Sequence, residues 1–412
     1  MNDEKYLSGM ITGAVCALAL FSVTVFIVAL VLGKSNRSTV SYNNVKESET
    51  SVTIENSKDK IFGKMELLAD IINEYSLYDV PEEDIIEGVY QGMFDSMNDK
   101  YADYYTAEEY KQFAESTNGE YCGIGAYIGQ NVDTNAIYIS EPMEGSPAME
   151  VGLRSGDIIY KVDDKVLGDE SLDTVVTWIK GEEGTKVKLT IIREGESDYL
   201  EFEVTRKNIE VPTVKGELLE NEVGLISISS FDKVTASQFE ETVNKLKEQG
   251  MKKMIIDLRS NPGGMLDVVV DMLDMFLEPG KMIVYTQDKT ETTTEQYKSQ
   301  NPKVIDMPLV VLINGYSASA SEIFAGAIQD YKLGTLVGET SFGKGIVQTV
   351  LPVGDGSYVK FTTAKYFTPN GRYIHEVGIE PDEKVEFDSK AYYDENVDNQ
   401  LNKAKEIINS ME

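Results

Sequence analysis

The chain has 412 residues, which at roughly 150 residues per domain allows two or three domains. Hydrophobic residues make up 42% of the chain and charged residues 26%, a composition that excludes general disorder. Asp and Glu outnumber Lys and Arg by 70 to 38, and the net charge of −32 argues against nucleic acid as a partner. Two cysteines exclude a disulfide framework or a thiolate-rich zinc site, and a His-based site would have to use the single histidine, His375.

After a short tail at residues 1–10, residues 11–32 contain no charged side chain. A helix of that length spans a hydrocarbon core of about 30 Å, so the run predicts one transmembrane anchor. A cleaved signal peptide is the alternative, but the run ends in Leu30–Gly33 without a small-x-small cleavage site. The basic residues on either side are too few to orient the anchor. Residues 33–60, rich in Ser, Thr, Asn, Lys and Glu, predict a flexible linker.

Residues 61–118 show helical periodicity, with Leu67, Leu68, Ile71 and Ile72 on one face and a break at Pro81. In residues 119–206 the pattern changes to short strands rich in β-branched and aromatic residues, with two short helices between them. These segments indicate a helical region followed by a small separate domain.

Residues 207–390 alternate between strands and helices, a pattern typical of an α/β domain. The predicted strands are 224–229, 254–258, 309–313 and 335–338, and the predicted helices are 236–248, 265–276 and 319–331. Residues 391–412 form the C-terminal region, with a helix predicted over Asn399 to Asn409.

Three loops of the α/β domain carry residues with chemical potential. The first, Asp257 to Gly264, follows a strand, opens a helix and ends in Asn261-Pro262-Gly263-Gly264. Glycines permit close backbone approach, and their amides can face an anion or a developing oxyanion. An ordinary strand–turn–helix connection explains the same loop, so the loop alone assigns no function.

The second loop, Asn314 to Ile323, leaves an apolar strand and places Ser317, Ser319 and Ser321 at a helix start. Free amides and the helix dipole favour negative charge there. Ser319 and Glu322 also form a capping-box pattern, which explains a serine and a glutamate without any chemistry. The residues alone do not select one serine as a nucleophile.

The third loop brackets Lys344 with Gly343 and Gly345, four residues before Gln348. A serine nucleophile needs a base, and a neutral lysine is a substitute for histidine. At a pKa of about 10.4 almost no lysine is neutral at pH 7, so burial must lower the pKa. Gln348 could orient the amine without adding a charge that raises the pKa again.

These three loops resemble those of the carboxy-terminal processing, or tail-specific, proteases, and the resemblance covers the chain from about Phe62 onward. The 25 residues between Ser319 and Lys344 (344 − 319) match the family's spacing from nucleophile to lysine. The resemblance implies Ser319 as nucleophile, Lys344 as general base and Gln348 as the residue that orients it. It also implies an oxyanion hole from the amide of Ala320 and one from Gly263 or Gly264.

Residues 119–206 are similar to a PDZ domain, with the run Gly123, Ile124, Gly125 and Ala126 at the position of the loop that captures a terminal carboxylate. The family resemblance implies a crotonase- or ClpP-like α/β protease core with this PDZ domain inserted. It further implies an extracytoplasmic catalytic part, a protein substrate with a free C-terminus, homodimerisation, and no metal or organic cofactor.

The sequence therefore predicts a membrane-anchored serine endopeptidase that recognises protein tails. A catalytically silent PDZ adaptor at the membrane is the alternative from another functional class, and a hydrolase that uses His375 is a third. The substrate, and whether the PDZ domain inhibits or activates cleavage, remain open.

Overall fold

A computed structural model describes residues 58–411, and the chain divides into two compact units after Pro81. The described part of the first unit contains α2 (Lys58–Tyr75), none of whose residues is buried. The described part of this helix includes the last residues of the predicted linker, and Asp59 lies in its first described turn. The predicted anchor lies outside the described residues. Within residues 58–411 no helix combines the length and the apolar character needed to cross a membrane.

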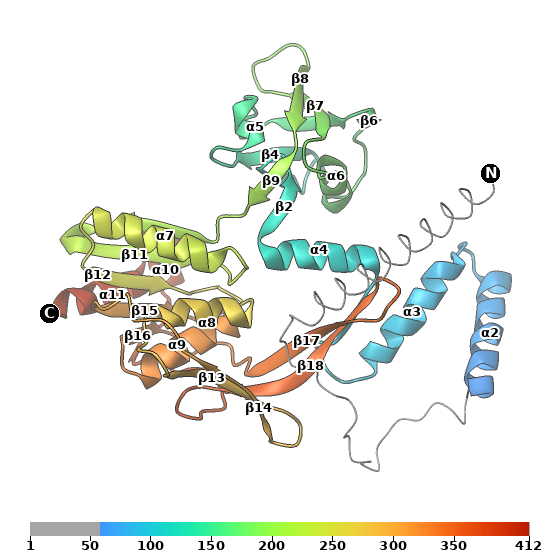
Figure 1. Cartoon of the computed structure of the whole chain (residues 1–412). Coiled ribbons are helices and arrows are strands. Elements are labelled where there is room, and N and C mark those ends of the chain that lie inside the picture. The colour runs from blue at the N-terminus through green and yellow to red at the C-terminus, as the bar shows by residue number, and fades with distance from the viewer. Residues whose placement is uncertain (1–57, 412) are drawn as a thin grey trace, which may run out of the picture. The chain divides into compact units, whose positions relative to one another are not determined.

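The second unit begins with α3 (Glu82–Asp95), β1 (Asp103–Tyr105) and α4 (Ala107–Asn118) (Figure 1). A capping box between Thr106 and Glu109 starts α4, and Gly119 ends it with a φ of 68°. Helical periodicity predicted α3 and α4 but missed β1. That strand has three residues and pairs antiparallel with β18 (Tyr358–Phe367), more than two hundred positions later in the chain.

The segment predicted as a PDZ domain forms a sheet with its own hydrophobic core. Its strands are ordered β3-β4-β5-β7-β8, with β6 beside β5, while β2 and β9 form a separate two-stranded sheet. Ile139, Val175 and Leu189 are fully buried at the centre of this core. The elements are β2 (Glu120–Gly123), β3 (Ala126–Gln130), β4 (Ile137–Pro142), α5 (Pro147–Glu150), β5 (Ile158–Val162), β6 (Lys165–Val166), α6 (Leu172–Ile179), β7 (Lys186–Ile192), β8 (Leu200–Thr205) and β9 (Lys207–Glu210).

The α/β core is built on a six-stranded sheet ordered β10-β11-β12-β15-β16-β19. All neighbouring strands run parallel except β10, which pairs antiparallel with β11. The predicted strand–helix alternation is confirmed here. The strands are β10 (Val214–Leu218), β11 (Val223–Ile228), β12 (Lys253–Asp257), β15 (Leu309–Ile313), β16 (Thr335–Gly338) and β19 (Glu383–Lys384), and the helices are α7 (Thr235–Glu248), α8 (Leu266–Asp274), α9 (Ala320–Asp330), α10 (Ser389–Glu395) and α11 (Asn399–Ser410).

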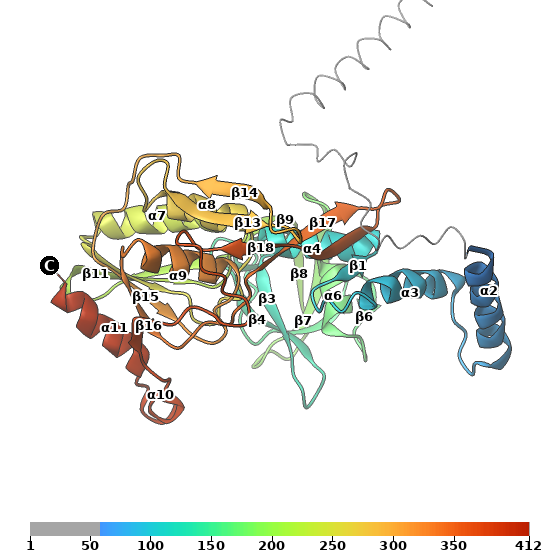
Figure 2. The ribbon, with the colours of Figure 1, turned by 90° about the horizontal axis from the view of Figure 1, so that it is seen from below.

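Helices cover both faces of this sheet, because alternate side chains of each strand point to opposite faces. Met254 and Ile256 of β12 pack with α7, α8 and α9 in one buried cluster. Ile255 lies between them in sequence and packs with Ala404 and Ile408 of α11 in another. Figure 2 shows α7, α8 and α9 on one side of the sheet and α11 on the other. The loops at the carboxyl ends of the strands are therefore held from two sides.

A second sheet joins β1, β18, β13 (Met282–Gln287) and β14 (Thr293–Lys298), with β17 (Ile346–Pro352) paired to β18. None of these strands appeared among the predicted elements. The residues of β17 are only half-buried, apart from exposed Pro352, so they lack the continuous apolar run of β15. Strand β17 carries Gln348, one of the candidate site residues.

Candidate active site

The loop after β12 is shaped by the side chain of Asn261, which is fully buried. Its amide nitrogen donates to the Ile228 carbonyl at 2.9 Å, and its oxygen accepts from the Gly263 amide at 2.8 Å. Gly263 has a φ of 103°, and a Cβ there would lie 2.6 Å from the Ala318 carbonyl oxygen and 2.8 Å from the Ser319 Cβ. Only glycine therefore fits where this loop meets the serine segment.

The three candidate serines have different environments. The Ser317 hydroxyl donates to the Leu258 carbonyl at 2.7 Å, and the Ser321 hydroxyl donates to the Asn261 carbonyl at 3.0 Å. Both side chains are fully buried, so their hydroxyls hold the two loops together. Ser319 is instead half-buried and lines an open cavity.

The backbone of Ser319 is strained, with φ 55° and ψ −114° at the start of α9. Such a conformation costs of order 1–3 kcal/mol and is typical of functional positions. The predicted capping box is present, and the Ser319 amide donates to Glu322 Oε2 at 2.8 Å. The strained turn presents the serine side chain to the cavity.

Glu322 joins the serine segment to the lysine loop. Its fully buried carboxylate also accepts from the Ser341 hydroxyl at 2.6 Å and from the amides of Gly343 at 2.7 Å and Lys344 at 2.8 Å. Each of these bonds to a charged acceptor is stronger than a neutral one. The sequence analysis identified Glu322 only as a helix cap and missed this second role.

Lys344 and Gln348 share with Ser319 a cavity of about 540 Å³, which Tyr101, Gly264 and Ala320 also line. Burial lowers the pKa of Lys344 from its usual value, and the nearby positive charges of Lys360 and Lys100 lower it further, against the opposing charges of Glu322 and Asp99. The amide nitrogen of Gln348 is buried and has no hydrogen-bond partner in residues 58–411. Over the same residues, no hydrogen bond joins the Ser319 hydroxyl to the Lys344 amine.

Two backbone amides beside Ser319 have no protein acceptor within the described chain, those of Ala320 and Gly264. The Ala320 amide is at the first turn of α9, where helix amides are normally free. Both residues line the cavity. The Gly263 amide already donates to the Asn261 side chain. Of the two glycines in the predicted oxyanion loop, only Gly264 therefore has an amide free to donate to a substrate, within the described residues.

A second hollow, of about 240 Å³, lies at the predicted carboxylate loop of the PDZ segment. Gly123, Ile124 and Ala126 line it together with Val176 and Ile179 of α6. Gly125 has a φ of 73°, and a Cβ there would lie 2.4 Å from the Ser146 Cβ. The lining is mainly apolar, with Lys180 as its one charged residue.

Two segments of the chain match models of known protein families. Residues 222–385 match the model of peptidase family S41, and residues 138–193 match that of a PDZ domain. The carboxy-terminal processing protease CtpA of Bacillus subtilis (strain 168) is 35% identical over 328 residues, which cover 80% of this chain and 70% of that protein. The chain belongs to the carboxy-terminal processing protease family.

Other family members are similar over comparable lengths. A "Probable CtpA-like serine protease" of Staphylococcus aureus (strain N315) is 37% identical over 335 residues, 81% of this chain. The match spans 66% of that relative, slightly under two thirds of its length. Among solved structures, a photosystem II D1 C-terminal processing protease is 26% identical, with a TM-score of 0.46 and coverage of 78% of this chain and 86% of that one.

His375 and Ser319 line different hollows of this protein. It lines a neighbouring hollow with Tyr373 and Glu376, and its Nδ1 is buried without a hydrogen-bond partner in the described residues. Its backbone packs behind the lysine loop, since a Cβ on Gly345 would lie 2.6 Å from the His375 nitrogen. No contact links His375 to Ser319 in residues 58–411, which leaves the His-based hydrolase without structural support.

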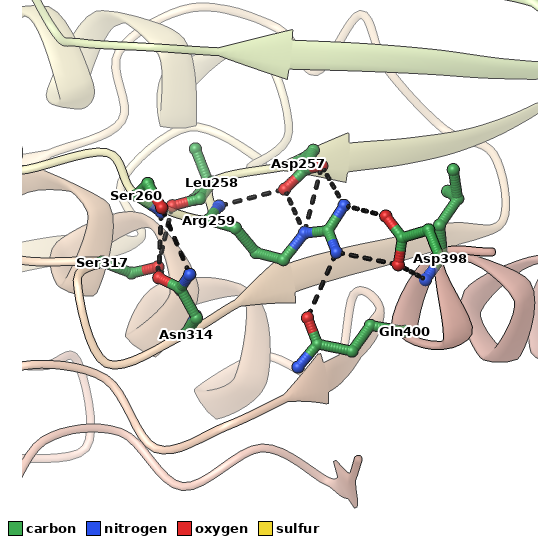
Figure 3. A network of polar contacts seen from close by, with 9 residues as sticks. Asp257, Leu258, Arg259, Ser260, Asn314, Ser317, Asp398 and Gln400 are labelled. Atoms are coloured by element: carbon green, nitrogen blue, oxygen red, sulfur yellow. Dashed lines mark hydrogen bonds and ion pairs between the residues drawn. The ribbon is translucent and has the colours of Figure 1, made fainter. Parts of the chain in front are cut away.

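Sequence reasoning also missed an ion network beside the site (Figure 3). Arg259 donates to both Asp257 and Asp398, with the shortest contacts at 2.7 Å and 2.8 Å, and its third partner is Gln400 at 3.1 Å. The network connects the loop after β12 to the start of α11. The pattern Asp257-x-Arg259 at the end of a strand could have indicated the local ion pair. Nothing in the local sequence indicates the distant partner Asp398.

Proposed function

We propose that this protein is a serine endopeptidase in which Ser319 is the nucleophile and Lys344 the general base. The observation that carries the proposal is the separation of the three serines. Ser317 and Ser321 are committed to backbone carbonyls, whereas Ser319 lines a cavity with a lysine whose pKa is lowered. A nucleophile needs access to substrate and a neutral base, and Ser319 alone of the three has both.

The reaction follows from these positions. Neutral Lys344 accepts the proton of the Ser319 hydroxyl while the serine oxygen attacks the scissile carbonyl carbon. The amides of Ala320 and Gly264 donate to the oxyanion of the tetrahedral intermediate, since the Gly263 amide is already occupied. Lys344 then gives its proton to the leaving amine as the peptide C–N bond breaks. Water, deprotonated by the same amine, attacks the carbonyl carbon of the acyl-serine. The bond from that carbon to the serine oxygen then breaks, the serine oxygen takes the proton back from Lys344, and the second product leaves.

Gln348 is proposed to orient the Lys344 amine. Its unpartnered buried amide lies in the same cavity and carries no charge. The Ser319–Lys344 hydrogen bond is proposed to form when substrate closes the site, as catalytic hydrogen bonds in unliganded enzymes often tighten only in the complex.

Tail recognition is assigned to the hollow of the PDZ domain. The apolar lining at Ile124 and Ile179 suits a hydrophobic last residue, and successive amides from Gly123 to Ala126 suit its carboxylate. The anchor at residues 11–32 is proposed to hold the catalytic part at the outer face of the cell membrane, near proteins whose tails it trims.

Substitution of either dyad residue tests the proposal. Ser319→Ala and Lys344→Ala are expected to lower kcat for a protein with an apolar tail by at least about a thousandfold. Ser389→Ala, at an exposed serine of α10, and Lys365→Ala, at an exposed lysine of β18, are matched controls that should keep kcat within a few fold. Full turnover by either dyad variant would contradict the mechanism. Tail binding by the unaltered chain without cleavage would favour the silent adaptor.

A further inference from the structure

Four aromatic residues line the cavity, Tyr101, Phe113, Tyr297 and Tyr366, and the proposed mechanism uses none of their rings. The Lys344 ammonium lies 4.4 Å from the ring centre of Tyr101, over the ring face. Lys344 takes part in no ion pair within residues 58–411. The ring face attracts the ammonium, because the face of an aromatic ring is electrostatically negative.

The Tyr101 backbone is fixed in place by Asp99. One carboxylate oxygen of Asp99 accepts from the Tyr101 amide at 3.0 Å, and the other accepts from the Thr362 amide of β18 at 2.8 Å. The carboxylate therefore fastens the turn that carries Tyr101 onto the sheet that carries Gln348. The backbone that carries the ring is therefore anchored to the sheet on both sides of the Asp99 carboxylate.

The Tyr101 hydroxyl does not explain the position of the side chain. It is buried and has no hydrogen-bond partner in the described chain. A buried polar atom without a partner costs free energy, so the site retains Tyr101 despite its polar end. The feature that the site uses is the ring face.

We infer that Tyr101 is a positioning residue for the proposed dyad, whose ring holds the Lys344 side chain and stabilises the ammonium that forms when the amine takes the Ser319 proton. A carboxylate in the same place would stabilise the ammonium so strongly that the resting lysine would stay charged. A ring attracts the cation more weakly, so the amine can still lose its proton. This inference rests on the proposed function for its catalytic meaning.

The other charges that face Lys344 set the sign of each expected effect. Lys100 lies over the same ring at 4.9 Å, and Lys360 of β18 also faces the amine. Both repel the ammonium, whereas Glu322 of α9 and Asp99 favour it. Burial is the largest cause of the lowered Lys344 pKa, so the ring must be replaced by an apolar side chain that keeps the amine buried. Such a replacement should lower the pKa of Lys344 further, and removing Lys100 should raise it.

The test is a titration of Lys344 in the full chain in detergent micelles, by NMR of lysine labelled at its ε carbon. The Lys344 signal is identified by its absence in Lys344→Met. Tyr101→Phe should leave the pKa of Lys344 unchanged, Tyr101→Leu should lower it by about half a pH unit to one pH unit, and Lys100→Met should raise it. The turnover of Tyr101→Leu should fall about ten- to a hundredfold with little change in KM.

Phenylalanines with one, two or three ring fluorines at position 101 keep the shape of the ring while weakening its attraction for cations. They should lower the pKa of Lys344 stepwise, and they decide the matter if Tyr101→Leu does not fold. An unchanged pKa across this series would overturn the role of Tyr101 and leave the dyad intact. Failure of the dyad would appear separately, as full turnover by Ser319→Ala or Lys344→Ala.

Discussion

The carboxylate of Glu322 accepts hydrogen bonds from two segments that flank the proposed dyad, the Ser319 turn and the loop from Ser341 to Lys344. Both oxygens are used, each by two donors. The distance between the serine and lysine loops is therefore set by one buried side chain. This residue links the helix start to the base, although it touches neither reacting atom.

Replacing Glu322 with Gln keeps the size of the side chain but turns one acceptor into a donor. The new amide would face two groups that themselves donate. We expect a loss of at least about 2 kcal/mol in the free energy of unfolding, measured with urea, and a large loss of turnover. Glu339→Gln, which changes an acceptor for the single amide of Phe387, should cost less than about 1 kcal/mol. Equal stability and turnover for Glu322→Gln and the unaltered chain would refute this role.

At the same scale, sequence reasoning identified residues whose signal was local. Ser319 and Glu322, which cap the helix, are three positions apart in the sequence. The two glycines that bracket Lys344 are its direct neighbours. The second role of Glu322 depends on Ser341, nineteen positions later. Tyr101 belongs to a different region of the chain from Lys344. Such contacts exist only after the sheets form, so no local pattern predicts them.

Among the elements, α11 is held to the sheet by packing on one face and by Arg259 at its start. Burial raises the pKa of Asp398, but hydrogen bonds from Arg259 and from the Leu401 amide outweigh it and leave the pKa below its ordinary value. Because the folded-state pKa is lowered, the carboxylate contributes stability above its unfolded pKa. That contribution disappears as the pH falls through the folded value.

Arg259→Met should therefore destabilise the protein by about 3–5 kcal/mol at neutral pH, since it leaves Asp257 and Asp398 charged and unpaired in a largely buried place. The difference from the unaltered chain should shrink below about pH 4 as Asp398 becomes protonated. Lys403→Met breaks an exposed pair with Glu406 on α11 and should leave the free energy of unfolding nearly unchanged. A constant difference between Arg259→Met and the unaltered chain from neutral to acid pH would contradict the assignment.

Elements with strong periodicity were predictable, and elements defined by pairing were not. The fully buried strand β15 is a continuous apolar run, and the buried helix α9 is largely apolar after its polar cap, so both sequences indicate their structure directly. The half-buried strands β17 and β18 are stabilised chiefly by each other and by distant β1 and β13. Their fold depends on partners far along the chain, so the hairpin that carries Gln348 escaped sequence reasoning.

At the scale of the whole molecule, the proposed anchor at residues 11–32 predicts that the protein is held in the membrane. Leu20→Asp with Val25→Asp places two charges in residues 11–32, each costing about 3 kcal/mol at a helix centre. The double variant should move from the membrane pellet to the supernatant after alkaline extraction and keep its turnover. Ser38→Asp, outside the run, should stay in the pellet. Retention of the double variant in the membrane pellet would contradict the anchor.

The expected homodimer stays a prediction. Leu67, Leu68 and Ile71 of α2 are exposed and open to a partner.

The most direct test of the central claim is the rate at which a fluorophosphonate labels Ser319 as the pH is varied, in the full chain and in Lys344→Met. The account predicts that labelling of the unaltered chain rises with pH through a midpoint below the usual lysine pKa of about 10.4. In Lys344→Met, labelling should be slow at every pH. Labelling of Lys344→Met that equals the unaltered chain in rate and pH dependence would show that Lys344 does not activate Ser319.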